Sequence, residues 1–111
     1  MITNQLSLTM PISQKMAELK KGGYLLKFRR EATCLYCIEL NQWITPDSFT
    51  VDEYYHFEDS LNTDEDRMLY AISSIEGQKG LLVDTCFVYE DNISPEMMQR
   101  LKWEYTRLTT Y

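Results

Sequence analysis

The sequence predicts an α+β domain of two layers: a mainly antiparallel sheet of four to five strands, with an N-terminal and a C-terminal helix packed on one face. Three observations lead to this prediction. A helical apolar period opens the chain, short alternating segments separated by turn residues follow, and a second helical period closes it. Because consecutive strands joined by short turns pair antiparallel, we expect the other face of the sheet to be open.

The length and composition of the chain fit a single domain over residues 1–111. Hydrophobic residues make up 44% of the sequence, which is enough for a packed core. Residues 1–9 are polar and show no period, so we expect them to form a flexible N-terminal tail.

The charge of the chain narrows the range of partners. The formal net charge is −6 and the isoelectric point is about 4.7. An acidic chain repels phosphate backbones and anionic lipids, so we expect neither nucleic acid nor a membrane as a partner. Residues 1–10 have no basic region and no apolar region, so we expect no signal peptide. Three cysteines are an odd number for a disulfide framework. Free thiols in a reducing compartment are the simplest account, and the sequence therefore predicts a cytoplasmic protein.

The first helix is predicted from Ile12, Met16 and Leu19, which recur at helical spacing. Gly22 and Gly23 follow directly and are typical of a helix C-terminus. The helix is therefore expected to end at this glycine pair.

Alternation of apolar and polar residues predicts strands at about 24–29, 33–40, 50–58, 68–75 and 81–89. Residues 41–48 hold Pro46 and Asp47 and are predicted as a loop. The segment Glu76-Gly-Gln-Lys-Gly80 is a hairpin turn signal. In the middle strand, one face is expected to carry Val51, Tyr55 and Phe57, and the other Asp52, Tyr54, His56 and Glu58.

The last helix has the best start signal in the chain. Ser94 is a good N-cap and Pro95 occupies the first helical position. Ile93 and Met98 have the spacing of a hydrophobic staple. The apolar stripe of this helix is expected to comprise Met98, Leu101, Tyr105 and Leu108.

Sulfur and nitrogen ligands suggest one candidate site. Cys34 and Cys37 have the spacing of a metal or redox pair, and His56 and Cys86 are the available further ligands for a metal or small molecule. No helix is expected after Cys37, as a redox pair would need. Residues three apart on a strand also point to opposite faces, so the alternative is that both cysteines are small core residues. No cofactor is predicted.

A catalytic role is a further hypothesis, because Asp52 and Glu58 lie four and two residues from His56 on the same expected strand face. A carboxylate on the same strand face could orient the imidazole as a general base. The alternative is a hydrated histidine on a polar face. The chain contains no glycine-rich phosphate loop and no nucleophile elbow, so we predict no catalytic residues and favour a protein that is not an enzyme.

Aromatic residues lead to the main functional hypothesis. They make up 13% of the sequence, more than one small core holds, so some are expected on the open face of the sheet. Asp84 lies within an apolar strand and requires hydration or a partner, for which Lys27, Arg29 and Arg30 are available.

We therefore predict a non-catalytic protein-binding or regulatory module that meets a protein partner, or a second copy of itself, through an open, tyrosine-rich sheet face. The candidate interaction residues are Tyr54, His56 and Asp84.

From about Lys20 onward the chain resembles a family of small uncharacterised bacterial proteins of about this length. The resemblance rests on Leu19-Lys-Lys-Gly-Gly-Tyr24, Phe49-Thr-Val-Asp-Glu-Tyr54, His56-Phe-Glu58, Tyr70-Ala-Ile-Ser-Ser74, Lys79-Gly-Leu-Leu-Val-Asp84 and Tyr89-Glu-Asp-Asn-Ile-Ser94. It implies a compact stand-alone domain.

Some members of that family are labelled phosphoribosylpyrophosphate synthetase, and we reject this activity for the present chain. In that enzyme the ribose-phosphate loop follows an apolar strand and holds two adjacent acidic residues and a Thr-Gly pair. Here Leu81-Leu-Val-Asp84 is followed by Thr85-Cys86-Phe87, without a glycine to cradle a phosphate. The resemblance therefore implies no activity.

Overall fold

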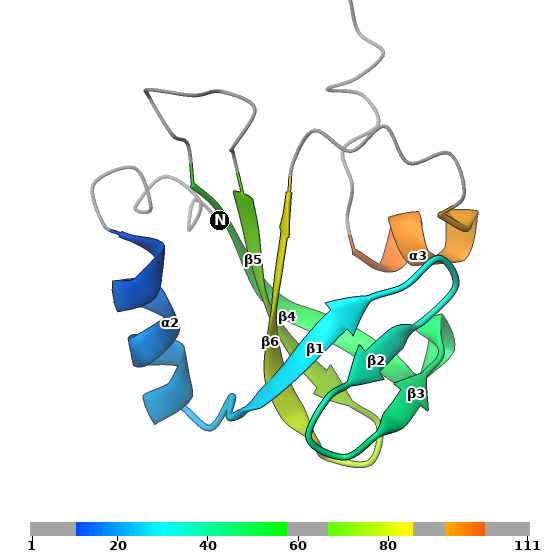
Figure 1. Ribbon diagram of the computed structural model, residues 1–111, viewed down its shortest axis with the longest axis horizontal. Coiled ribbons are helices and arrows are strands. Elements are labelled where there is room, and N and C mark those ends of the chain that lie inside the picture. The colour runs from blue at the N-terminus through cyan, green and yellow to red at the C-terminus, as the bar shows by residue number, and fades with distance from the viewer. Residues whose placement is uncertain (1–10, 58–66, 86–92, 102–111) are drawn as a thin grey trace, which may run out of the picture.

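The computed structural model describes residues 11–57, 67–85 and 93–101 (Figure 1). The elements in chain order are α2 (Ile12–Lys21), β1 (Leu26–Arg30), β2 (Leu35–Cys37), β3 (Gln42–Ile44), the 3-10 turn η2 (Pro46–Ser48), β4 (Phe49–Phe57), β5 (Arg67–Ser74), β6 (Lys79–Thr85) and α3 (Pro95–Arg100). The predicted α+β class is confirmed. None of the helices in these ranges is long and apolar enough to cross a membrane.

Six strands form one mixed sheet in the order β3-β2-β1-β6-β5-β4. Strands β1 to β3 form one antiparallel meander and β4 to β6 form another. The two meanders join where β1 pairs with β6 in parallel. The expected sheet of four to five strands, mainly antiparallel, is therefore wrong. Turn signals specify pairing between neighbours along the chain, whereas the β1–β6 pairing joins segments that are distant in sequence.

Strand β3 lies within residues 41–48, which the sequence predicts as a loop. The strand expected at 33–40 is also shorter, because β2 ends at Cys37 and the chain turns over residues 38–41. Asn41 adopts a φ of 54° in this turn, a left-handed conformation that asparagine tolerates better than most residues. The turn brings Leu35 opposite Ile44, so β3 becomes the edge strand of the sheet.

Each face of the sheet carries its own core. The α3-side core comprises Phe28, Leu35, Cys37, Ile44, Phe49, Met68, Tyr70, Ile72, Leu82, Ile93, Met97 and Leu101. The α2-side core comprises Leu19, Tyr55, Phe57, Leu69, Ala71 and Leu81. Strand β5 contributes buried residues to both cores in alternation, as expected of a strand that is covered on its two faces.

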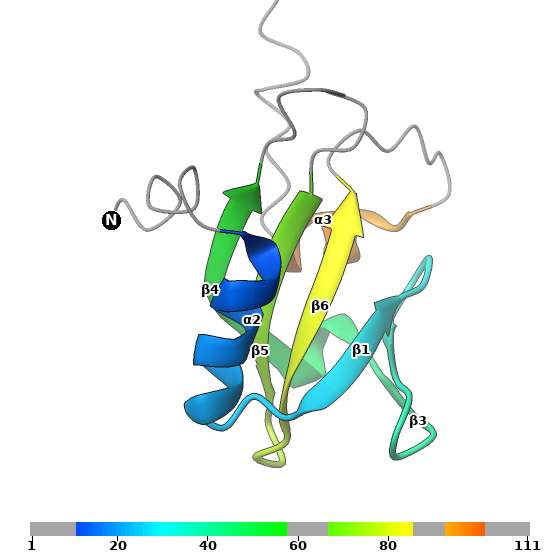
Figure 2. The same ribbon diagram turned by 60° about the vertical axis from the view of Figure 1, so that its left-hand side comes forward.

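The two helices accordingly lie on opposite faces of the sheet (Figures 1 and 2). The prediction that both pack on one face is wrong. Amphipathic periodicity shows that a helix covers an apolar surface, but the near-continuous apolar run Met68–Ile72 offers such a surface on each side.

The predicted C-terminal end of α2 is confirmed. The helix ends with Lys20 and Lys21 in its last turn, where the helix dipole favours cations. Gly22 is the C-cap, and its N–H donates to the Leu19 carbonyl oxygen at 2.9 Å. Gly23 follows with a φ of 107°, a conformation that favours glycine.

Helix α3 begins as predicted and is anchored at both ends. The Ser94 side chain accepts a hydrogen bond from the Met97 N–H at 3.2 Å, and Pro95 occupies the first helical position. The Ser94 N–H donates to the Ala32 carbonyl oxygen at 2.8 Å, and Arg100 Nε donates to the Pro46 carbonyl oxygen at 2.6 Å.

The buried face of α3 is centred on Met97 and Leu101, while Met98 is half-buried. Tyr105 and Leu108 of the predicted stripe lie outside the described residues, as do Glu58, Cys86 and the expected tail at residues 1–9.

The β1–β6 junction depends on a close approach at Gly80. This residue pairs with Leu26, and a methyl group added to its Cα would lie 2.5 Å from the Leu26 carbonyl oxygen. That contact is far shorter than van der Waals separation, and the neighbouring atom belongs to the backbone. Any side chain at this position would therefore push the two strands apart.

We expect Gly80→Ala to lower the free energy of unfolding by about 1–3 kcal/mol, as overpacking in a tight interior contact does. Urea denaturation measures this loss. Gly22→Ala is the matched control, because its added methyl group would lie 3.3 Å from Leu19 and its φ is −84°. Equal stability of the two variants would show that the junction tolerates a side chain.

Candidate functional site

Helix α2 covers only half of its side of the sheet. The strand residues of the α2-side core come from β4, β5 and β6, whereas the buried residues of β1, β2 and β3 all belong to the α3-side core. The surface of β1 to β3 on the α2 side is therefore open, and it is here that exposed aromatic and cationic side chains gather.

Arg29, Tyr36 and Trp43 form a row across the three strands of this open surface. Tyr36 pairs with Arg29 on one side and with Trp43 on the other. The Tyr36 and Trp43 ring centroids are 4.7 Å apart, and the Arg29 guanidinium lies 4.9 Å from the Tyr36 ring centroid. Aromatic pairs and cation–π contacts of this kind fix side chains against one another. The row is thus ordered although the Trp43 side chain is 61% exposed.

A groove with a volume of about 680 Å³ lies beside this row, between α2 and β1. We call it the α2–β1 groove. Its apolar lining includes Met16, Leu25, Ile38, Leu81 and Val83. Leu25 is 67% exposed, and Ile38 and Val83 are exposed as well. An apolar surface of this extent, open to water, is typical of a binding groove.

Cations surround the α2–β1 groove in a chain that is acidic overall. Lys20, Lys27 and Arg29 line it. Arg29 pairs with Glu31 at 2.5 Å, but neither lysine forms a salt bridge within the described ranges. Glu39 also lines the groove, and a hydrogen bond of 2.9 Å from the Lys27 backbone N–H lowers the pKa of its carboxyl group. The two lysine ammonium groups therefore remain available to a ligand.

The structure does not group the predicted sulfur and nitrogen ligands. Cys37 is buried on β2, and Cys34 is half-buried in the turn before it. Burial raises the pKa of the Cys34 thiol, which makes it a poorer metal ligand. His56 lies on β4, and β1, β6 and β5 stand between that strand and β2. Cys86 is outside the described residues, among which no three metal-ligating side chains form a group.

The predicted pairing of His56 with Asp52 is prevented by a β-bulge. The register of β4 against β5 shifts between Val51 and Glu53, so Asp52 is an extra residue and the expected alternation breaks. The Asp52 carboxylate accepts hydrogen bonds from Tyr24 and Ser73 on the α2 side. His56 pairs with Met68 of the α3-side core and lies on the other face. Glu58 falls outside the described residues.

The three predicted interaction residues all lie on the α3 side. Tyr54 packs against the α3-side core, and its ring stacks on Tyr70 with centroids 6.4 Å apart. His56 and Asp84 are the two cross-strand neighbours of Met68 in that core. The exposed aromatic row lies on the opposite face from these three residues. Their part in an interaction stays a prediction.

Asp84 has one of the three partners that the sequence offered. Its carboxylate accepts a hydrogen bond from Arg30 Nε at 2.5 Å. The side chains of Arg30 and Asp84 are 15% and 10% exposed. The pair explains how an ionised carboxylate is accommodated in an apolar strand.

The Arg29–Tyr36–Trp43 row was not among the predicted sites. An excess of aromatic residues predicts that some are exposed but does not say which, and the Tyr36–Trp43 contact requires β3, a segment whose sequence predicts a loop. The alternation in Gln42-Trp-Ile44, with its apolar Ile44, is the signal that could have revealed this strand.

No protein-family model matches this chain, and no match was found among curated proteins or solved structures. The family resemblance seen in the sequence stays a prediction.

We expect Asp84→Ala to lower the free energy of unfolding by about 3–5 kcal/mol, because it leaves the Arg30 charge largely buried without this carboxylate. Urea denaturation measures the loss. Glu18→Ala is the control, since it removes a carboxylate that is 48% exposed from the Lys15–Glu18 pair and should cost less than about 1 kcal/mol. Similar losses in the two variants would contradict a structural role for the Arg30–Asp84 pair.

A second prediction concerns alkaline pH and Tyr24. Burial, the hydrogen bond of 2.7 Å to Asp52 and the charge of that carboxylate raise the pKa of Tyr24 to about 12. The unfolded pKa is about 10. Because the folded pKa is the higher one, the contribution of Tyr24 to stability is complete below pH 10 and is lost as the pH rises to about 12.

Titration of tyrosinate absorbance checks this, with Tyr24→Phe identifying the signal of Tyr24. In Asp52→Asn the charge is removed, so we expect the pKa of Tyr24 to fall while burial keeps it above about 10. A Tyr24 that titrates near its ordinary value in the unmodified protein would contradict the Tyr24–Asp52 contact.

Proposed function

We propose that this domain is a non-catalytic protein-binding module that uses the open surface of β1, β2 and β3. The single observation that carries the proposal is the Arg29–Tyr36–Trp43 row. Tryptophan, tyrosine and arginine are the residue types most enriched among side chains that dominate binding energy at protein interfaces. Here Tyr36 contacts both Arg29 and Trp43, and the three side chains share one open surface.

The preordered row supports this proposal on energetic grounds. Binding costs side-chain entropy for every flexible group that an interface immobilises. The Tyr36 ring is held between Arg29 and Trp43, and its hydroxyl donates to Asn41 Oδ1. A partner that covers Trp43 would therefore gain apolar contact with only a small further loss of side-chain entropy.

The α2–β1 groove suggests the chemistry of the partner segment. Its apolar walls favour aliphatic side chains, and the ammonium groups of Lys20 and Lys27 favour carboxylates. Four cations line the groove against two carboxylates, those of Glu39 and Asp84, so its local charge is positive. At physiological ionic strength charges are screened over about 8 Å, so this local excess outweighs the distant negative charge of the chain. We infer that the partner offers a segment in which acidic and apolar residues are interspersed.

Panning a phage library of random linear peptides against the protein tests this proposal. We expect the enriched peptides to combine Asp or Glu with apolar residues. For synthetic versions of these peptides, Trp43→Ala and Lys27→Gln should each weaken binding about tenfold or more, measured by isothermal titration calorimetry. Lys21→Gln is the matched control, because this lysine is exposed on α2 but does not line the groove.

Unchanged affinity in folded Trp43→Ala and Lys27→Gln variants would reject this surface as the binding site. Sedimentation equilibrium addresses the other occupant, a second copy of the chain. A dimer that Trp43→Ala converts to a monomer would assign the surface to self-association instead.

A further inference from the structure

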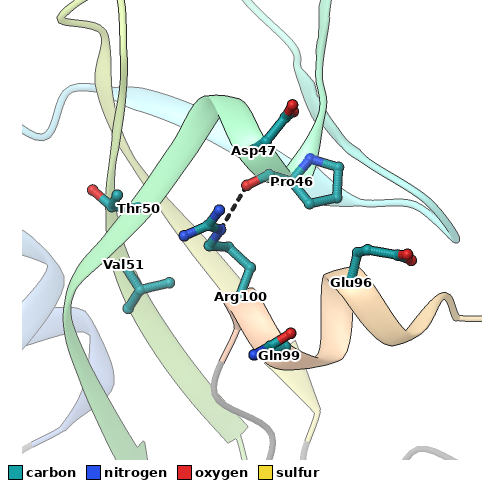
Figure 3. A pocket seen from close by; sticks show the side chains of 7 residues that line it. All are labelled: Pro46, Asp47, Thr50, Val51, Glu96, Gln99 and Arg100. Atoms are coloured by element: carbon teal, nitrogen blue, oxygen red, sulfur yellow. Dashed lines mark hydrogen bonds between the residues drawn. The ribbon is translucent and has the colours of Figure 1, made fainter.

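The two faces of β1, β2 and β3 differ in how they are covered. On one face, α3 shares a core with buried residues from all three strands. It is fixed there by a hydrogen bond of 2.6 Å from Arg100 Nε to the Pro46 carbonyl oxygen (Figure 3). On the other face, α2 packs on β5 and its neighbours β4 and β6 (Figure 2). Within the described ranges, the α2 side of β1 to β3 therefore lacks the helix that the opposite side has.

The strand spacing of the sheet places a second helix above β1. In the sheet, β1 lies two strands away from β5, on which α2 packs. Neighbouring strands are about 4.8 Å apart, so this separation is about 10 Å. Helices that pack side by side have axes about 8–10 Å apart. A helix beside α2 would therefore lie above β1, between α2 and the Tyr36–Trp43 pair.

The elements that border the α2–β1 groove set its length. Helix α2 has 10 residues and β1 has 5, which correspond to about 15 Å of helix and about 16 Å of strand. Leu25 directly precedes β1, and Val83 continues the β1–β6 register to the level of Arg29. These two exposed apolar residues are thus about 13 Å apart along the strand. Residues i and i+7 of a helix are about 10.5 Å apart, so one apolar stripe can contact both.

The backbone of the groove floor disfavours an extended partner. Strand β1 pairs with β2 on one side and with β6 on the other, and β6 also pairs with β5. A partner strand would therefore find no free strand edge there. Buried backbone N–H and C=O groups without partners are costly. A helix satisfies its own backbone groups, and an apolar groove accepts the apolar face of an amphipathic helix.

The cations of the groove determine the charge of such a helix. Lys20 on α2 and Lys27 on β1 are exposed and line the groove from two different elements. A helix above β1 lies close to both side chains. Asp or Glu residues that flank its apolar stripe would meet the ammonium groups, whereas a basic helix would be repelled.

We propose that the partner segment is an acidic amphipathic α-helix of about three turns, which packs beside α2 and above β1. Its apolar residues recur at helical spacing and contact Leu25, Ile38 and Val83. Its carboxylates pair with Lys20 and Lys27. The inference rests on the proposed function, because it gives the conformation and chemistry of the partner at the same surface.

Selection from two patterned phage libraries tests the helical partner. Both display peptides of about 14 residues with the same proportions of acidic and apolar amino acids. In the helical library the apolar positions follow 3,4 spacing, and in the alternating library they occupy every second position. We expect binders from the helical library alone, with a gain of helical circular dichroism on binding. A proline at the centre of such a peptide should weaken binding at least about tenfold in isothermal titration calorimetry, because it breaks the helix.

Val83→Thr shows whether these peptides lie in the groove. Threonine has nearly the shape of valine but places a hydroxyl group on the groove floor, so the helical peptides should bind about fivefold more weakly or worse. Val51→Thr is the matched control, because Val51 packs against the α3-side core on the opposite face. It should leave the affinity unchanged.

Failure of the helical partner and failure of the proposed function give different results. Binders from the alternating or the random library alone, or binders that tolerate the central proline, would overturn the helix. The protein-binding surface would still stand if Trp43→Ala weakened those binders. Peptides that depend on Trp43 but not on Val83 would place the partner outside the groove, which also overturns the helix beside α2. A lack of binders from all three libraries would reject the protein-binding function itself.

Discussion

The parallel pairing of β1 with β6 is the constraint on which the rest of the structure depends. Each antiparallel meander is a three-stranded unit, and this single pairing makes them one sheet. Across it, Phe28 meets Leu82 on the α3 side, and Lys27 meets Leu81 on the α2 side. The close approach at Gly80 sets the spacing of the two strands. The α3-side core, which draws on both meanders, exists only because this junction holds.

The placement of the helices determines which surfaces remain for binding. Helix α2 packs over the second meander, so the first meander keeps an open side that carries the Arg29–Tyr36–Trp43 row. Helix α3 packs on the opposite face and is fixed to η2 by the hydrogen bond from Arg100 to Pro46. The open binding surface is thus a consequence of a sheet face that α2 covers only in part.

Local signals predicted what depends on local structure. The glycine pair after α2, the Ser94 cap and the hairpin turn before Gly80 were all correct, because each is determined by a few adjacent residues. The β1–β6 pairing could not be read in the same way, since it depends on packing between distant segments. The bulge at Asp52 likewise depends on partners in other elements, Tyr24 and Ser73, and it reversed the expected face of that carboxylate.

The type of candidate site, an open surface with exposed aromatic residues, was predicted, but its position in the fold was not. Exposed aromatic residues on an open surface were expected, but Tyr54 packs on a core and Trp43 is the exposed one. The position of Trp43 could not be predicted, because the three residues of β3 give too short a pattern to recognise as a strand. The cation that neutralises Asp84 was among those foreseen, but the choice of Arg30 needed the register of two strands that are far apart in the chain.

The β1–β6 junction also bears on how fast the chain can fold. The two hairpins of the second meander and the short turns of the first connect near neighbours, and such units form within microseconds. Arg30 and Asp84, by contrast, are 54 positions apart. The chain between them must lose conformational entropy before the contact contributes favourable free energy. We therefore expect the closing of this junction to be the slow step, in which two preformed halves meet along a single pair of strands.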